Sequence, residues 1–440
     1  GGQIRYVRQL LDALGNHPKV RKVDLFTRLI RDKTVSPDYG EPVEVLSPKA
    51  RIVRIQCGGL KYRKKERLWP FLDEFVDKTL RFIKQENDLP NVVHGHYADG
   101  NYIADQLSEI LGVVFVASAH SLGRNKKRML AEGGMGEAEM DRRFNLSHRI
   151  KVEEHVLRAA DLVVTSTNYE IKHHYGLYDY SDTPRYAAIP AGIDTDLFYP
   201  FYRMSQPSQP TVEHAEEEQA YHSVTEEVDR FLMEPSKPLV LSVSRADRRK
   251  NLETLMHAFG ADRELRCIAN LAIFAGIRKD ITEMDENERA VLTDLLLLMD
   301  KYDLYGSLAI PKKSDPLYEI PAIYRLACWR KGVFVNPTPG ETFGLTLIEA
   351  ASCGLPIIAS PDGGPADIIE NCRNGLPVDT TDPKVLADAI RSIVTDTEGW
   401  KRYSGNGIKG VAEHYTWASH ARKYVGEIER LTKAPDRIEI

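Results

Sequence analysis

Short apolar runs rich in β-branched residues alternate with longer amphipathic stretches along the whole sequence. The strand-like runs form two series, which lie at 22–29, 51–55, 91–97, 113–120, 161–166 and 186–190, and then at 238–245, 270–276, 333–337 and 355–360. The stretches between them carry helical patterns, for example at 4–14, 68–85, 252–260 and 288–302. Strands that alternate with helices predict an α/β protein with parallel, doubly wound sheets.

A polar, acidic and proline-bounded segment at 201–237 separates the two series. Because 440 residues also exceed the size of one compact core, we expect two Rossmann-like domains, at 1–200 and 238–415. The segment between them is expected to be an interdomain connection with a helix near 213–233. Residues 416–440 are expected to form a helix that packs back on the N-terminal domain. Since the sequence opens on a turn-like Gly-Gly-Gln, we also expect the first strand and the true N-terminus to be missing.

The charge and the cysteine pattern argue against several classes of function. A net charge of -5 and a pI of about 6.3 argue against nucleic acid as the main partner, because phosphate backbones require a basic face. Five cysteines without a paired motif exclude a zinc ribbon or a disulfide framework and favour the reducing cytoplasm. No apolar run approaches the ~18 residues of a membrane span, so no membrane partner is expected.

The segment at 340–369, GETFGLTLIEAASCGLPIIASPDGGPADII, contains two glutamates eight residues apart. It follows a predicted strand, and its TLIEAASCG portion predicts a helix that ends at a glycine. The free backbone N–H groups at the start of that helix are suited to a pyrophosphate. Glu341 in the loop can accept hydrogen bonds from hydroxyl groups, and Glu349, about one turn into the helix, can hold a ribose diol. Taken alone, two such acids are better explained by a capped helix with solvated side chains.

A second candidate site follows the first strand of the second series, where SRADRRKN occupies 244–251. Arg245 and Lys250 are candidates to face an anion, because transfer from a nucleotide sugar leaves a diphosphate whose growing charge needs fixed cations. Alone, this motif is more simply explained as a solvated basic start of a helix.

The N-terminal half offers two weaker signals. Gly1, Gly2 and Gln3 open a helix and could present backbone N–H groups to a phosphate or an acceptor, although a lone glycine pair also fits a flexible chain end. His120 ends a predicted strand, where a lone histidine is more often a hydrogen-bonded structural residue. Neither signal identifies a site by itself.

Three basic runs share the N-terminal half: KYRKKER at 61–67, RNKKR at 124–128 and HRIK at 148–151. Any one of them alone indicates a solvated charged face. Together they could converge on a dianionic phosphate, which multidentate cations bind well.

The string ETFGLTLIEAASCGLPIIASPDGGP resembles the nucleotide-sugar signature of the retaining GT-B glycosyltransferases of family GT4. More narrowly, the chain resembles the sucrose-phosphate synthase family. The similar motifs follow in the expected order: GGQIRYVRQLLDALG, HGHYADG, AHSLGRNKKRML, HRIKVEEHVLRAADLVVTST, KPLVLSVSRADRRKN, DKYDLYG and AIYRLACWRKGVFVNP. The resemblance implies a GT-B fold, in which two Rossmann-like domains face each other across a cleft.

The resemblance also implies a retaining transfer of glucose from UDP-glucose to fructose 6-phosphate, with no metal or other cofactor required. It assigns catalytic roles to His120, Arg245, Lys250 and Glu341, with His120 orienting the hexose. It assigns donor binding to Phe343, Gly344, Leu345, Thr346 and Glu349. It assigns acceptor binding to Gly1, Gly2, Gln3, Lys65, Lys126 and Arg149, the last three as a clamp for the acceptor phosphate.

Some positions depart from the family pattern, so alternatives stay open. Thr342 stands where the family usually has proline, Pro339 and Gly340 replace bulkier residues, and IPKKS at 310–314 replaces a Tyr-Pro-Lys-His-His run near the nucleotide base. A sucrose synthase-like activity on free fructose, or a donor such as ADP-glucose or GDP-mannose, is therefore a rival. A regulatory protein that binds a nucleotide sugar without turnover is a further alternative. Gly363 and Gly364 are expected to support the same cleft, with no contact assigned.

Overall fold

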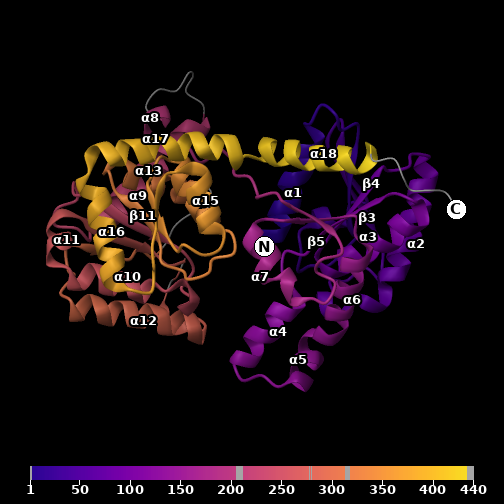
Figure 1. Cartoon of the computed structure of the whole chain (residues 1–440), viewed down its shortest axis with the longest axis horizontal. Coiled ribbons are helices and arrows are strands. Elements are labelled where there is room, and N and C mark those ends of the chain that lie inside the picture. Colours follow the sequence, from indigo (N-terminus) through magenta and orange to yellow (C-terminus); the bar gives the residue numbers. More distant parts are fainter. Residues whose placement is uncertain (1, 205–211, 277, 279, 313–317, 434–440) are drawn as a thin grey trace. The chain divides into compact units, whose positions relative to one another are not determined.

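The computed structural model describes residues 2–204, 212–276, 278, 280–312 and 318–433 (Figure 1). The chain divides into two compact units. Unit 1 comprises residues 1–191 together with 417–440, and unit 2 comprises residues 192–416. The polypeptide therefore leaves unit 1, completes unit 2 and then returns to unit 1.

The first sheet of unit 1 has the strand order β1-β3-β2. Its strands are β1 (Val23–Arg28), β2 (Val43–Ser47) and β3 (Ala50–Ile55). β1 and β3 are parallel, as expected, but the unpredicted β2 runs antiparallel to β3. Only two residues join β2 to β3, and so short a connection can form only a hairpin. The expectation of purely parallel sheets is therefore wrong at this strand.

The second sheet of unit 1 has the order β4-β5-β6-β7 and is entirely parallel. Its strands are β4 (Val92–His96), β5 (Val114–Ser118), β6 (Leu162–Thr165) and β7 (Arg185–Ala188). Helices α3 (Tyr97–Leu111) and α6 (Leu146–Ala159) pack against one face, where Phe115 and Val156 are buried. Helix α18 (Trp417–Lys433) packs against the other face, beside α1 (Gly2–Gly15) (Figure 1).

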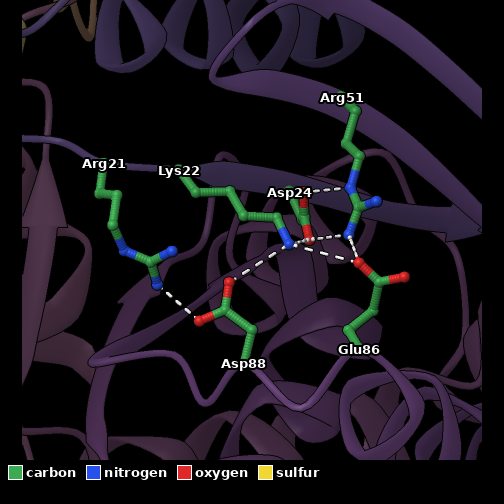
Figure 2. A network of polar contacts seen from close by, with 6 residues as sticks. All are labelled: Arg21, Lys22, Asp24, Arg51, Glu86 and Asp88. Carbon is green, nitrogen blue, oxygen red and sulfur yellow. Dashed lines mark hydrogen bonds and ion pairs between the residues drawn. The ribbon is translucent and has the colours of Figure 1, made fainter.

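The remaining helices of unit 1 lie around these sheets. They are α2 (Leu72–Glu86), α4 (Gly123–Glu132), α5 (Glu137–Phe144) and α7 (Asn168–His173), with short 3-10 turns at Pro37–Gly40, Lys65–Arg67, Trp69–Phe71 and Tyr175–Leu177. Helix α2 buries Phe75 against Val53 and Ile55 of β3. A network of charged side chains reinforces this contact, because Arg51 of β3 bonds both Asp24 of β1 (2.8 Å) and Glu86 of α2 (2.6 Å) (Figure 2).

Unit 2 contains one parallel sheet with the order β10-β9-β8-β11-β12-β13. Its strands are β8 (Leu239–Val243), β9 (Asn270–Phe274), β10 (Leu308–Ala309), β11 (Val333–Asn336), β12 (Ile357–Ala359) and β13 (Gly375–Pro377). Apart from the outermost β13 and the last residue of β8, every strand residue is buried. Continuous apolar strands of this kind are expected where helices cover both faces of a parallel sheet.

Two hydrophobic clusters cover the two faces of this sheet. One cluster is formed with α10 (Leu252–Ala261), α11 (Arg263–Ile268), α12 (Glu286–Lys301) and α16 (Pro383–Thr395). The other is formed with α9 (Val212–Asp229), α13 (Glu319–Trp329), α14 (Leu345–Ser352), α15 (Gly364–Cys372) and α17 (Thr397–His414). Unit 2 also contains α8 (Phe201–Met204) and 3-10 turns at Arg248–Lys250 and Ile281–Glu283. Two α/β units with parallel sheets agree with the predicted fold class.

The predicted interdomain connection at 201–237 is instead part of unit 2. Its expected helix is present as α9, but Val224 and Val228 of this helix are buried in the core of unit 2, and α9 contacts α13. The apolar positions Ala220, Val224 and Val228 recur every four residues between acidic ones, so the overall acidic composition concealed a narrow buried stripe. Residues 205–211 of the segment lie outside the described residues. No helix among the described residues is long and apolar enough to cross a membrane.

Candidate functional site

The candidate donor residues of unit 2 follow three neighbouring strands. β8, β11 and β12 lie side by side in the sheet, and the loops after them carry 244–251, 337–344 and 360–364. Because the strands are parallel, these loops leave the same edge of the sheet, which is where open α/β sheets bind ligands. The sequence motifs that are about 100 residues apart are brought together in this way.

Lys250 and Glu341 meet directly at this edge. The Nζ atom of Lys250 lies 2.5 Å from Oε2 of Glu341, and both side chains are mostly buried. Asn251, with a left-handed backbone (φ 53°), donates through Nδ2 to the carbonyls of Pro337 (3.1 Å) and Thr380 (3.0 Å). The asparagine thus fastens the Lys250 turn to the loop that carries Glu341. The sequence did not predict this ion pair.

Arg245 is differently placed from the other cations of its motif. Asp247 bonds Arg249 (2.5 Å), and this hydrogen bond is the main cause that lowers the pKa of Asp247 to about 2. Arg245 itself is exposed, and within the described part of the chain its side chain makes no ion pair. A guanidinium in this state is available to an anion at the edge of the sheet.

Helix α14 begins where the sequence predicted. Gly344 caps it with a left-handed backbone (φ 96°), followed by the exposed Leu345 and the partly exposed Thr346. Its first N–H groups have no partners within the helix, so this end favours an anion. Glu349 lies in the second turn and accepts a hydrogen bond from the buried hydroxyl of Tyr324 (3.0 Å). Burial and the charge of Glu349 together raise the pKa of Tyr324, a residue that sequence reasoning missed.

Gly363 and Gly364, the glycine pair after β12, lie against the loop that carries Glu341 and Phe343. A Cβ on Gly363 would lie 2.2 Å from the carbonyl oxygen of Glu341, and one on Gly364 would lie 2.3 Å from that of Phe343. The N–H of Gly364 donates to the Glu341 carbonyl (2.9 Å). Only glycines allow this close approach, which fixes the backbone of the loop between Glu341 and Phe343. Phe343 itself packs against the core beside Tyr415.

The three predicted acceptor cations of unit 1 converge around one small pocket of about 10 Å³, which is the space of a single water molecule. Lys65, Lys126 and Arg149 all line it, although they come from three separate basic runs. The other lining residues are Glu66, Trp69, Tyr97, Asp99 and Phe144. Burial raises the pKa of Asp99.

Tyr97 joins two of these cations and was not predicted. Its hydroxyl accepts hydrogen bonds from Nζ of Lys65 (2.7 Å) and from Nη1 of Arg149 (2.6 Å). Because its oxygen already accepts two hydrogen bonds, the Tyr97 hydroxyl is left to donate its own proton to a third group. Its backbone is left-handed (φ 69°), which is rare for a residue other than glycine and often marks a functional site. The HGHYADG motif, where the last strand residue meets a helix, was the available signal.

The three cations differ in how far their charge is compensated. Arg149 is buried and bonds Glu153 (2.8 Å) as well as the carbonyl of Ser121. Lys126 lies 3.6 Å from the ring centroid of Phe144, and among the described residues it has no acid within ion-pair distance. Burial, followed by repulsion from Lys65 and Arg149, lowers the pKa of Lys126. An incoming anion would relieve that repulsion.

His120 lies two residues beyond β5 with a left-handed backbone (φ 55°). Its Nε2 lies 3.0 Å from Nδ1 of His96, and its ring contacts the ring of Tyr6 on α1. His120 is accessible to solvent, but the surrounding protein atoms still lower its pKa to about 4 through desolvation. It is therefore a neutral imidazole near neutral pH, able to donate or accept one hydrogen bond rather than supply charge.

Some of the remaining predicted positions lie outside the residues that the structure describes. Gly1 lies outside the described residues, whereas Gly2 and Gln3 form the first turn of α1. In the 310–314 segment, residues 313 and 314 also lie outside the described residues. Within the described part of the chain, no group of three or more His, Cys, Asp and Glu side chains is placed to hold a metal ion.

Comparison with known protein families assigns both halves of the chain. A model of the glycosyl transferases group 1 family matches residues 224–410, and a model of the first GT-B domain of sucrose synthase matches residues 21–232. The catalytic domain of starch synthase IV from Arabidopsis thaliana, solved with ADP and acarbose, shares the fold at 16% identity, with a TM-score of 0.62 over 99% of this chain and 96% of that one. The chain thus has the GT-B fold, and its two halves match glycosyltransferase families.

Individual relatives narrow the assignment. A probable sucrose-phosphate synthase from Oryza sativa subsp. indica is 41% identical over 97% of this chain and 44% of its own length, and sucrose-phosphate synthase 4 of Arabidopsis thaliana is 40% identical over 98% and 45%. A solved sucrose-phosphate synthase from Thermosynechococcus elongatus has 27% identity and a TM-score of 0.67 over 98% of this chain and 94% of that one. The chain belongs to the sucrose-phosphate synthase family, and it spans about half the length of the curated relatives it matches.

Proposed function

We propose that the chain transfers glucose from UDP-glucose to fructose 6-phosphate, with retention of the anomeric configuration, and gives sucrose 6-phosphate and UDP. The relatives named as sucrose-phosphate synthases support this proposal. The observation that carries it is the convergence of three cations in unit 1, Lys65, Lys126 and Arg149. Free fructose has no charge that would require three cations, whereas a sugar phosphate does.

The donor is proposed to bind at the edge formed by the ends of β8, β11 and β12. Its diphosphate would lie at the start of α14, with Arg245 and Lys250 supplying positive charge. Glu341 would hold hydroxyls of the hexose, and Glu349, already oriented by Tyr324, would hold the ribose diol. His120 would orient the hexose through one hydrogen bond, consistent with its neutral state.

The proposed mechanism is a front-face transfer. The bond between the anomeric carbon and the diphosphate oxygen breaks, and the acceptor hydroxyl attacks from the same face. The departing phosphate oxygen takes the proton of that hydroxyl, so UDP leaves as the acceptor oxygen bonds to glucose. Negative charge on the diphosphate grows during this step, and fixed cations that face it lower the barrier.

We further propose that the transfer needs no metal ion, because Arg245 and Lys250 can carry the diphosphate charge. Rates that are unchanged after treatment with EDTA would support this, and rates restored by added Mg²⁺ would contradict it. We also propose a cytoplasmic location. All five cysteines are free, and Cys57, Cys353 and Cys372 are buried, a pattern compatible with a reducing compartment.

Two rival activities have specific observations in their favour. The family model that matches 21–232 describes a sucrose synthase domain, which favours free fructose as acceptor. The IPKKS segment at 310–314 differs from the family near the base, which favours a donor such as ADP-glucose or GDP-mannose. The three converging cations argue against the first rival, and no described residue argues against the second.

A panel of substrates tests the proposal. The purified chain is offered UDP-glucose, ADP-glucose or GDP-mannose with either fructose 6-phosphate or fructose, and nucleotide release is measured. We expect release with UDP-glucose and fructose 6-phosphate at a rate at least 100-fold above that with fructose, since a phosphate clamp contributes several kcal/mol. Equal rates with the two acceptors would favour the sucrose synthase-like alternative. No release with any pair would refute the proposal that the chain is a glycosyltransferase.

A further inference from the structure

A cavity of about 390 Å³ lies at the edge of the second sheet of unit 1, and the proposed reaction does not use it. β7 is the last strand of its sheet, so among the described strands it pairs only with β6. Five consecutive residues, 185–189, line the cavity, although successive side chains of a strand point to opposite faces. The backbone edge of β7 therefore borders the cavity, and its volume is in the range of small-molecule sites.

One flank of α18 forms the opposite wall. The lining residues Arg422, Gly426 and Arg430 are four apart, and Lys423 and Glu427 lie beside them on the same flank. The neighbouring flank of the helix, with Tyr424, Val425 and Ile428, packs on the sheet. A Cβ added to Gly426 would meet no atom within 4 Å, so the middle of this wall is open.

Positive charge predominates in the groove between β7 and α18. Arg185, Arg422, Lys423 and Arg430 line it, against the single carboxylate of Glu427. Glu427 already lies between two guanidinium groups, 2.7 Å from Nη2 of Arg185 and 2.5 Å from Nη1 of Arg430. The groove thus already holds one oxyanion, supplied by the chain itself.

Two of these cations remain uncompensated. Among the described residues, Arg422 and Lys423 have no acidic side chain within ion-pair distance. Arg422 and Lys423 are exposed, but desolvation by nearby protein atoms, followed by repulsion from Arg422, still lowers the pKa of Lys423. A second oxyanion would relieve this repulsion, and the open edge of a sheet can add backbone N–H donors to it.

We propose that the groove between β7 and α18 binds a small phosphorylated ligand. A phosphate group matches the guanidinium forks and the excess positive charge, and it accepts several hydrogen bonds at once. It would bind Arg422 and Lys423 and compete with Glu427 for Arg185. The site shares no residue with the pocket of Lys65, Lys126 and Arg149, so it is separate from the proposed acceptor site.

Binding of inorganic phosphate and of glycerol 3-phosphate tests this proposal in the full chain. Calorimetric titration is carried out in the Lys126→Ala background, which weakens the proposed acceptor site, and at constant ionic strength set with chloride. Hydrogen exchange of 185–189 and 422–430 is followed in parallel. We expect saturable binding with protection of both segments.

Substitutions in the groove give the matched comparison. Gly426→Leu places a side chain in the open space and is favoured over glycine in a helix, so the fold should be retained. We expect it to weaken glycerol 3-phosphate binding at least tenfold. Gly405→Leu on α17 also meets open space and serves as the control without effect. Glu427→Gln frees two arginines and should tighten binding about three- to tenfold.

Several outcomes would overturn the proposal. They are equal affinity in the Gly426→Leu and Gly405→Leu variants, no protection of 185–189, or binding to phosphatidate vesicles without binding to either soluble phosphate. Because the readout is binding and not turnover, its result is independent of whether the chain transfers glucose.

Discussion

Lys250 in unit 2 lies 2.5 Å from the carboxylate of Glu341, whereas Lys126 in unit 1 lies over the ring of Phe144. Among the described residues, Lys126 has no acid within ion-pair distance. In unit 2 a bound anion must therefore compete with the Glu341 carboxylate for Lys250. The interaction between Lys250 and the anion is then strongest when the anion acquires extra negative charge. In unit 1 the charge is already desolvated and repelled by its neighbours, so an anion is favoured as soon as it binds. Lys250 is therefore expected to contribute mainly to turnover, and Lys126 mainly to substrate affinity.

The largest expected effect comes from removing the paired cation. Lys250→Ala should lower kcat about 10²- to 10³-fold with a small change in the KM for UDP-glucose, because one fixed donor to developing charge is removed. Initial rates at saturating acceptor measure both constants. Arg248→Ala on the same turn, whose guanidinium is exposed and 3.5 Å from Asp294, is the control and should keep nearly full activity. A rise in KM with unchanged kcat would contradict the difference between the two cations.

Removing the unpaired cation should act on affinity. Lys126→Ala is expected to raise the KM for fructose 6-phosphate about 10- to 100-fold and to change kcat only a few-fold. The adjacent Lys127→Ala is the matched control, because Lys127 instead bonds the exposed Glu137 (2.6 Å). An equal rise in the KM for the donor would show that the pocket of unit 1 is misassigned.

Acid should distinguish the two units as well. Burial lowers the pKa of His94 to about 3 and that of His420 to about 4, whereas an unfolded histidine titrates near 6.5. The unfolded state then binds more protons, so this stabilisation is present above pH 6.5 and is lost as the pH falls from about 6.5 towards 4. For the buried His420 the loss is on the order of 3 kcal/mol.

Hydrogen exchange as a function of pH measures this difference unit by unit. We expect protection in β4, β5 and α18 to fall at higher pH than protection in β8 and β11. His414→Gln, at a partly exposed position of unit 2, should leave both transitions unchanged. Simultaneous loss of protection in both units would argue that the buried histidines do not determine the acid stability of unit 1.

The smallest expected effect concerns the charged network between β1, β3 and α2. Arg51→Ala removes the contacts to Asp24 and Glu86 and should destabilise unit 1 by about 1 kcal/mol, since these side chains are only partly exposed (Figure 2). Urea unfolding followed by hydrogen exchange in β3 measures this. Arg81→Ala, which removes an exposed pair with Asp77, should change stability by less than about 0.5 kcal/mol. Equal changes in stability from the two substitutions would show that the network stabilises unit 1 no more than an exposed ion pair does.

Local patterns were enough to predict most strands and the start of α14. Continuous apolar runs such as 238–245 and 333–337 specify buried strands regardless of their neighbours. The convergence of Lys65, Lys126 and Arg149 was also anticipated, because the family resemblance singled out these three positions. The three segments that carry these residues could therefore be recognised, in their order along the chain, from the sequence alone.

Contacts set by strand order could not be predicted in the same way. The pairing of Lys250 with Glu341 requires β8 and β11 to be neighbours, and the contact of Gly364 with the Phe343 loop requires β12 to lie next to β11. The role of Tyr97 depends on a left-handed backbone that favours glycine or asparagine over tyrosine. The membership of α9 in unit 2 depends on only a few apolar positions among acidic ones.

The discontinuity of unit 1 has a consequence for biosynthesis. Residues 192–416 are translated before α18, whose Tyr424 packs on the buried side of the second sheet. On the ribosome, the nascent chain of unit 1 must therefore keep part of the apolar face of β5 and β6 uncovered until α18 has been made. Unit 2 has no such delay and can fold as soon as it emerges. The synthesis of α18 thus controls when unit 1 can finish folding.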